Sequence, residues 1–200
     1  ERLLSQALEA DPKNRLALEG MLSLAESRRD GGQLCRSLRA LAELTPEPKE
    51  RVRYYRRLAV AARDLAFDLD LAVHAYREVL RVEPEDLPVL GELAALERRR
   101  SDMAGLAWAL EQRAKASEAA GDKRLAAAAL RELGQVLDVR LGRAGEALVA
   151  LEKAARLHPD PNALLELANL CLRLERAPNA RRALEDTLAL LPKHAPPEKL

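Results

Sequence analysis

Aromatic side chains are scarce in this sequence of 200 residues, at 2% of the chain. With one Trp, one Phe and three Tyr, a core must be filled by Leu and Ala. β-Branched residues are also few, which disfavours β-sheets and favours an all-helical chain. Only two cysteines are present, Cys35 and Cys171, and they lie 136 residues apart in apolar segments with helical spacing. We therefore expect two buried thiols rather than a disulfide.

The chain also lacks a charge excess and a long apolar run. Lys plus Arg is 33 and Asp plus Glu is 32, a net charge of +1, whereas nucleic-acid binders carry a basic excess or stripe. No run of 18 apolar residues is present, so no membrane span is expected, and we favour a cytoplasmic protein. The chain begins at Glu1, without Met and within a helical pattern, so we expect a piece of a longer protein.

Signatures of catalysis are missing as well. The histidines, His74, His158 and His194, have no Cys, His or Asp at metal-ligand spacing, which disfavours a zinc site. No glycine-rich phosphate loop occurs, and Gly31-Gly32 is interpreted as part of a turn between helices, at Asp30-Gly31-Gly32. We expect no metal and no cofactor, and we predict that the chain is not an enzyme.

What the sequence does contain is helical periodicity interrupted at regular intervals. Apolar residues recur at i, i+3, i+4 and i+7 almost throughout, and five Pro-containing stops divide the segments. The gaps between these prolines are 34, 38, 75 and 33 residues, and Gly121-Asp122 divides the longest gap into two. This recurrence is typical of stacked helical hairpins. The stops are Asp11-Pro12, Thr45-Pro46, Glu83-Pro84, His158-Pro159 and Leu191-Pro192.

The stops predict about 11 helices in one all-α solenoid over residues 1–200. The helical region is expected to end at Ala195-Pro196-Pro197. The second and fourth hairpins have about four extra residues in their first helices, which is one helical turn. Pro48 suits the first turn of its helix, and Asp122 suits a helix cap. The predicted elements are a half-hairpin at 1–11 and hairpins at 12–45, 46–83, 84–121, 122–158 and 159–192.

This pattern resembles the tetratricopeptide repeat family, in a degenerate form of bacterial type that covers nearly the whole chain. The family repeat has 34 residues, with apolar or small residues at positions 4, 7, 8, 11, 20, 24 and 27 and Pro at 32. Counting back from Pro46 places Leu18, Met21, Leu22, Ala25, Leu34, Leu38 and Leu41 at these positions. The later prolines place Ala72, Tyr76, Val79, Ala147, Leu151, Ala154, Ala180, Leu184 and, as a weaker fit, Thr187 at positions 20, 24 and 27.

The resemblance implies a right-handed superhelix whose first helices line a concave surface that binds peptides or proteins. Some members hold an acidic C-terminal peptide in a clamp of Lys, Asn and Arg side chains, but none of the matching residues here fits. Those residues are Glu19, Ser23, Tyr54, Pro88 and Glu92.

Two groups on the expected first helices are candidates for partner binding. Glu19, Ser23 and Glu26 would form an acidic, polar patch. The densest basic helix carries Arg53, Arg56, Arg57 and Arg63 beside Tyr54, and Arg and Tyr are frequent interface anchors. The alternative interpretation is that these charges are the solvated face of an amphipathic helix.

We therefore expect a protein–protein interaction scaffold that binds a peptide, helix or domain of another protein through its concave surface. The alternative is a regulatory or sensing segment of a larger signalling enzyme or transcription regulator. In that case the array would contact flanking domains of the same protein. Neither hypothesis includes nucleic acid as a partner.

Overall fold

The computed structural model describes residues 1–190. The predicted stops at Leu191-Pro192 and at Ala195-Pro196-Pro197, and His194, lie outside the described residues. The predicted all-α class is confirmed, since the described residues form eleven α-helices and one short π-helix and contain no strand. Two compact units divide the chain, Glu1–Asp102 and a second unit from Met103 onward.

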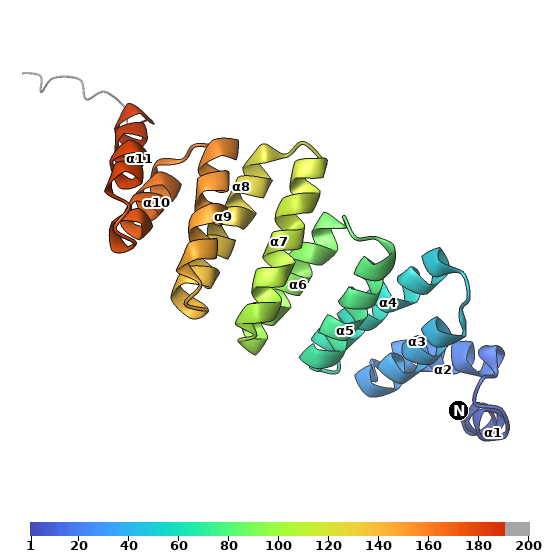
Figure 1. Cartoon of the computed structure of the whole chain (residues 1–200). Coiled ribbons are helices and arrows are strands. Elements are labelled where there is room, and N and C mark those ends of the chain that lie inside the picture. The colour runs from blue at the N-terminus through green and yellow to red at the C-terminus, as the bar shows by residue number, and fades with distance from the viewer. Residues whose placement is uncertain (191–200) are drawn as a thin grey trace, which may run out of the picture. The chain divides into compact units, whose positions relative to one another are not determined.

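In each unit, successive helices pack side by side (Figure 1). The first unit consists of α1 (Arg2–Ala10), α2 (Arg15–Arg28), α3 (Gly31–Leu44), α4 (Pro48–Asp64), α5 (Leu69–Val82) and α6 (Leu87–Arg100). The second consists of α7 (Met103–Ala119), α8 (Lys123–Gln135), the π-helix η1 (Val136–Arg140), α9 (Ala144–Leu157), α10 (Pro161–Arg173) and α11 (Ala177–Leu190). Since α6 and α7 belong to different units, the predicted hairpin 84–121 and the single right-handed solenoid stay predictions.

Side chains at the first residue before a helix determine where most helices begin. Pro48 opens α4, as predicted, because its missing N–H is not needed in the first turn. Asp122 is confirmed as a cap, with its carboxylate accepting the backbone N–H of Leu125 at 2.9 Å. Five further residues accept the N–H three positions ahead at 2.9–3.0 Å, namely Asn14, Asp30, Asp68, Asp86 and Asp160.

The turn between α2 and α3 differs from the prediction. The left-handed residue is Arg29, with φ of 55°, while Asp30 caps α3 and Gly31 and Gly32 belong to its first turn. Gly31 is needed for a different reason, which is the close approach of another hairpin. A Cβ atom at Gly31 would lie 2.5 Å from the carbonyl carbon of Leu65, a distance that real Cβ atoms do not reach. The glycine therefore lets the end of α4 pack on the start of α3.

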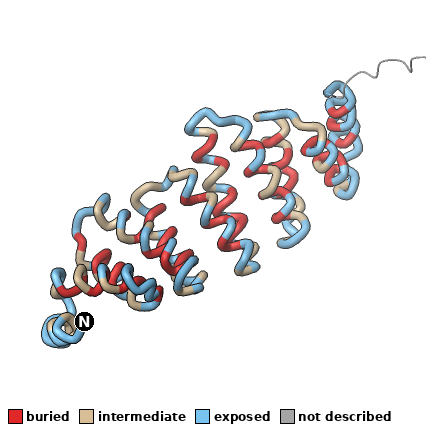
Figure 2. Tube along the Cα trace, turned by 180° about the vertical axis from the view of Figure 1, so that it is seen from behind, coloured by how far each residue is buried: buried red, intermediate tan, exposed pale blue. Residues whose placement is uncertain are grey.

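The predicted inward positions of the repeats are buried, and Figure 2 shows buried and exposed residues alternating along the helices. Leu38, Ala72 and Ala147 are at most 1% exposed. The prediction for Leu184 was wrong, because this side chain is 39% exposed on α11, the last described helix, which packs against α10. Thr187 is 4% exposed and its hydroxyl donates to the carbonyl of Ala183 at 2.8 Å, which explains how a hydroxyl fits an apolar position.

The extra turn predicted in the second hairpin is present, since α4 has 17 residues and α2 has 14. In the fourth, the extra length is divided between α8, with 13 residues, and the 5 residues of η1. The prediction gave extra length only to the first helices of the second and fourth hairpins, but α7, with 17 residues, is also long. Extra turns are therefore not confined to the helices in which they were predicted.

Candidate functional site

Ion pairs connect α2, α4 and α6, which the sequence predicts as first helices of successive hairpins, within the first unit. We call the exposed and half-buried polar side chains of these three helices the first-helix face. On this face, Arg15 of α2 donates to Glu50 of α4 at 2.9 Å, and Arg57 of α4 pairs with Glu26 of α2. Arg63 of α4 pairs with Glu92 of α6. The charged side chains on this face thus form ion pairs between helices. If the face only contacted water, as the alternative interpretation holds, such pairs would not be expected.

Arg56 of α4 is held by two carboxylates from other elements. Its guanidinium donates both to Glu83, at the end of α5, and to Asp86, which also caps α6. Burial lowers the pKa of this guanidinium, but the hydrogen bonds to the two carboxylates outweigh that effect and raise the pKa. Arg56 therefore has a structural role, holding the α5–α6 turn against α4.

Arg63 and Asp64 form a tight pair at the end of α4, with hydrogen bonds of 2.7 and 2.9 Å. The hydrogen bond from Arg63 lowers the pKa of the Asp64 carboxyl, and the same bond raises the pKa of Arg63. Asp64 is therefore a carboxylate whose charge is already matched.

A pocket of about 520 Å³ opens between α2 and α3 on one side and α4 on the other. Its volume lies within the range of roughly 300–1,000 Å³ that is usual for ligand pockets. Apolar side chains make up more than half of its lining residues, and charged side chains make up the rest. We call it the α3–α4 pocket and define it by its lining, Glu26, Leu34, Leu38, Arg56, Arg57, Val60, Ala61, Asp64 and Leu65.

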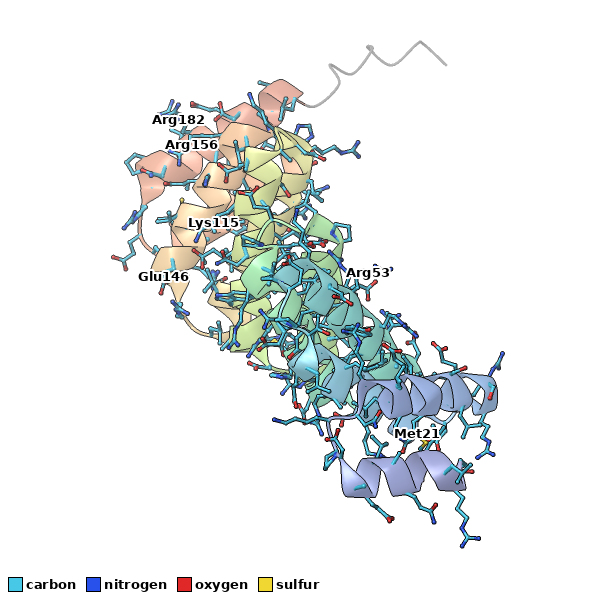
Figure 3. The ribbon with its side chains drawn as sticks, turned by 90° about the vertical axis from the view of Figure 1, so that its right-hand side faces the viewer. Met21, Arg53, Lys115, Glu146, Arg156 and Arg182 are labelled. Carbon is cyan, nitrogen blue, oxygen red and sulfur yellow. The ribbon has the colours of Figure 1, made fainter. Side chains whose placement is uncertain are left out.

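Three of the seven residues predicted to bind a partner line this pocket, namely Glu26, Arg56 and Arg57. A fourth, Arg53, which Figure 3 labels, is exposed and lies one turn before Arg57 on α4. Arg53 makes no ion pair within residues 1–190. The structure thus brings two arginines of the basic helix and one acidic residue of α2 to the same pocket. Whether they contact a partner stays a prediction.

The other three predicted residues lie on the first-helix face but do not line the pocket. Glu19 pairs with Arg15 of its own helix at 2.9 Å. The Tyr54 hydroxyl accepts from Arg15 at 3.5 Å, and Ser23 is exposed. Arg15 thus binds both Glu19 and Tyr54. The charge of Glu19, and with it part of the expected acidic patch of Glu19, Ser23 and Glu26, is therefore neutralised.

Sequence reasoning missed the apolar part of the pocket. Leu34 and Leu38 were predicted only as core, and Val60 and Leu65, which are 45% and 40% exposed, were not predicted as site residues. One signal could have found Val60, because it follows Arg53 and Arg57 at helical spacing. An apolar residue within an arginine-rich exposed stripe offers a partner both an apolar contact and a charge.

Other kinds of site have no support among the described residues. No group of three or more His, Cys, Asp or Glu in this part of the chain could hold a metal ion. Cys35 and Cys171 are free and buried, as predicted, and burial raises the pKa of both thiols. Within residues 1–190, no helix has both the length and the apolar character that crossing a bilayer requires.

Comparison with known proteins places the fold. No family model matches the sequence, and no curated protein does. Among solved structures, YrrB, a TPR protein with an unusual peptide-binding site, matches at TM-score 0.50 and 14% identity, over 96% of this chain and 93% of its own. Yeast Tom70 matches at TM-score 0.49 and 21% identity over 94% of this chain and 38% of its own, and MamA at 0.49 and 16% over 82% and 91%. The likeness to YrrB shows the fold.

Proposed function

We propose that this chain, which has the helical-hairpin fold of the tetratricopeptide repeat proteins, is a protein-interaction scaffold. Its partner segment, a peptide or a helix of another protein, lies along the first-helix face of the first unit and places an apolar side chain in the α3–α4 pocket. The observation that carries this proposal is the pocket itself, since it combines an apolar lining with exposed arginine on one helix. Such a pairing of an apolar pocket with a few charged groups is typical of binding sites.

The accessible apolar surface of the pocket supports this role. Val60 and Leu65 are both exposed to at least 40%, and charged side chains of α4, Arg56, Arg57 and Asp64, line the pocket beside them. Exposed apolar side chains at the edge of a pocket lose water contacts when a partner covers them, and this contributes roughly 25 cal/mol per Å² of buried apolar surface. The arginines around them orient the partner rather than supply most of the affinity.

Selection from a random peptide library displayed on phage tests the proposal with the full chain as bait. We expect selected peptides to lose binding when Val60→Lys places a charge in the pocket, and when Arg53→Glu and Arg57→Glu are combined. The matched control combines Arg36→Glu and Arg39→Glu, which makes the same change of charge on two exposed arginines of α3. Retained binding in the Val60→Lys variant, with an unchanged circular-dichroism spectrum, would contradict the proposed site.

A further inference from the structure

We infer that the α3–α4 pocket accepts a large aliphatic side chain with a carboxylate close to it in sequence, and that Glu26 competes internally for the arginine that receives this carboxylate. This inference rests on the proposed function and specifies the chemistry of the partner. It also assigns Glu26 a role opposite to that of its ion-pair partner, Arg57.

The aliphatic preference follows from the lining of the pocket. Leu34 and Leu38 of α3 are at most 7% exposed, whereas Val60 of α4 and Leu65, the residue after α4, are at least 40% exposed. The lining therefore extends from the buried core to the surface. No aromatic side chain lines it. A branched aliphatic group from a partner would extend the same packing of Leu, Val and Ala side chains outward.

The carboxylate preference follows from which charges are already matched. Asp64 is held by Arg63 through two hydrogen bonds, and Arg56 is held by two carboxylates. Arg53, in contrast, is exposed and unpaired within the described residues, and it lies one turn from Arg57 on α4. A partner with a carboxylate gains this uncompensated cation, whereas a partner with an ammonium group is repelled by it.

Glu26 occupies the place that a partner carboxylate would take. It comes from α2, and it pairs with Arg57 of α4, so the two charged residues meet where they line the α3–α4 pocket. Their side chains are 49% and 47% exposed, and ion pairs with this much exposure contribute little to stability. Arg57 can therefore exchange Glu26 for a carboxylate of the partner at small cost, while Arg56, held by the helix cap Asp86, cannot.

Two substitutions at this ion pair should act in opposite directions. Glu26→Gln keeps the shape of the side chain but removes the competing charge, so we expect binding to tighten by about threefold, within the range that exposed ion pairs allow. Arg57→Gln removes the receiving cation, so we expect binding to weaken by about threefold or more. The matched control is Glu111→Gln, which changes an exposed, ion-paired glutamate of α7 that does not line the pocket.

The experiment uses the full chain with ¹³C-labelled Leu and Val methyl groups and two probes, acetyl-Leu-Glu-amide and acetyl-Leu-Gln-amide. Titrations followed by methyl NMR give a dissociation constant for each probe from the signals of Leu34, Leu38 and Val60. We expect the acidic probe to bind more tightly than the neutral probe in the parent. We also expect Glu26→Gln to increase this preference, Arg57→Gln to reduce it, because only Arg53 then remains to attract the carboxylate, and Glu111→Gln to leave it unchanged.

The outcomes separate this inference from the proposed function. Equal affinity for the two probes would overturn the carboxylate preference, even if library peptides still depend on Val60. Weaker binding in Glu26→Gln would overturn the competitor role, because it would make Glu26 a supporting part of the site. If neither probe moves these methyl signals, an aliphatic anchor in this pocket is refuted.

Discussion

Gly31→Ala should destabilise the first unit, whereas Gly32→Ala, at the next residue, should not. The Cβ atom added at Gly31 would lie 2.5, 2.6 and 2.7 Å from the backbone of Leu65 and Ala66, and backbone atoms cannot rotate away. At Gly32 the added atom meets side-chain atoms of Asp30 and Arg36 at 3.6 and 3.7 Å, which is ordinary contact. Only the first substitution therefore forces the end of α4 away from α3.

The two variants share one energetic contribution and differ in the other. Replacing Gly by Ala in a helix stabilises a protein by about 0.4–1 kcal/mol, because the unfolded chain loses conformational freedom. Overpacking at a rigid contact costs about 1–3 kcal/mol. The free energy of unfolding of Gly31→Ala should therefore lie about 1–3 kcal/mol below that of Gly32→Ala, with Gly32→Ala at or above the parent.

Urea unfolding followed by circular dichroism at 222 nm, with m-values compared among the three proteins, measures this difference. Equal midpoints for the two variants would refute the close approach of Gly31 and Leu65. The substitution also bears on the α3–α4 pocket, because Leu65 is one of its lining residues. We therefore expect Gly31→Ala to weaken binding of peptides that depend on Val60.

Two further predictions concern Phe67 and Tyr76. Phe67 has a left-handed φ of 55° and a side chain that is 78% exposed, so Phe67→Gly should relieve backbone strain and raise the free energy of unfolding by up to about 1 kcal/mol; a lower urea midpoint would show that the phenyl ring contributes packing. Burial, and then Glu92, raise the pKa of Tyr76 in the folded protein above its ordinary value. The contribution of Tyr76 to the free energy of unfolding is therefore complete below the pKa of the unfolded chain. It is lost as the pH rises from that pKa to the pKa of the folded protein. We expect the urea midpoint to fall from about pH 9 to about pH 11, and to fall less in Tyr76→Phe, with an identical slope in both proteins counting against this assignment.

Local signals in the sequence were sufficient to predict most of the helices. Proline and Asp caps act within one turn of the chain, so Pro48 and Asp122 could be assigned without knowledge of any tertiary contact. Gly31 could not, because its role depends on Leu65, which is 34 residues away in sequence and adjacent in space. Leu184 was misassigned for a related reason, since helical spacing defines a face of α11 but not whether a helix covers it.

The candidate site was predictable only in part. The density of arginine on α4 pointed to Arg56 and Arg57, and both line the pocket. Their different situations were not visible in the sequence, because Arg56 is bound by Glu83 and Asp86 and Arg57 by Glu26, from other helices. The apolar lining was missed, since Leu34 and Leu38 have the spacing of ordinary core residues.

The sequence by itself determined the all-helical class, the helix ends at the proline stops and Asp caps, and the inward side of most helices, with Leu184 of α11 as an exception. These features depend on caps, proline and apolar spacing, whose effects extend over a few residues. Only the tertiary structure decided that neighbouring hairpins leave a pocket between α3 and α4 and that Glu26 reaches Arg57 beside it. A pocket is the space that remains after helices have packed, so its presence depends on contacts between residues that are distant in sequence.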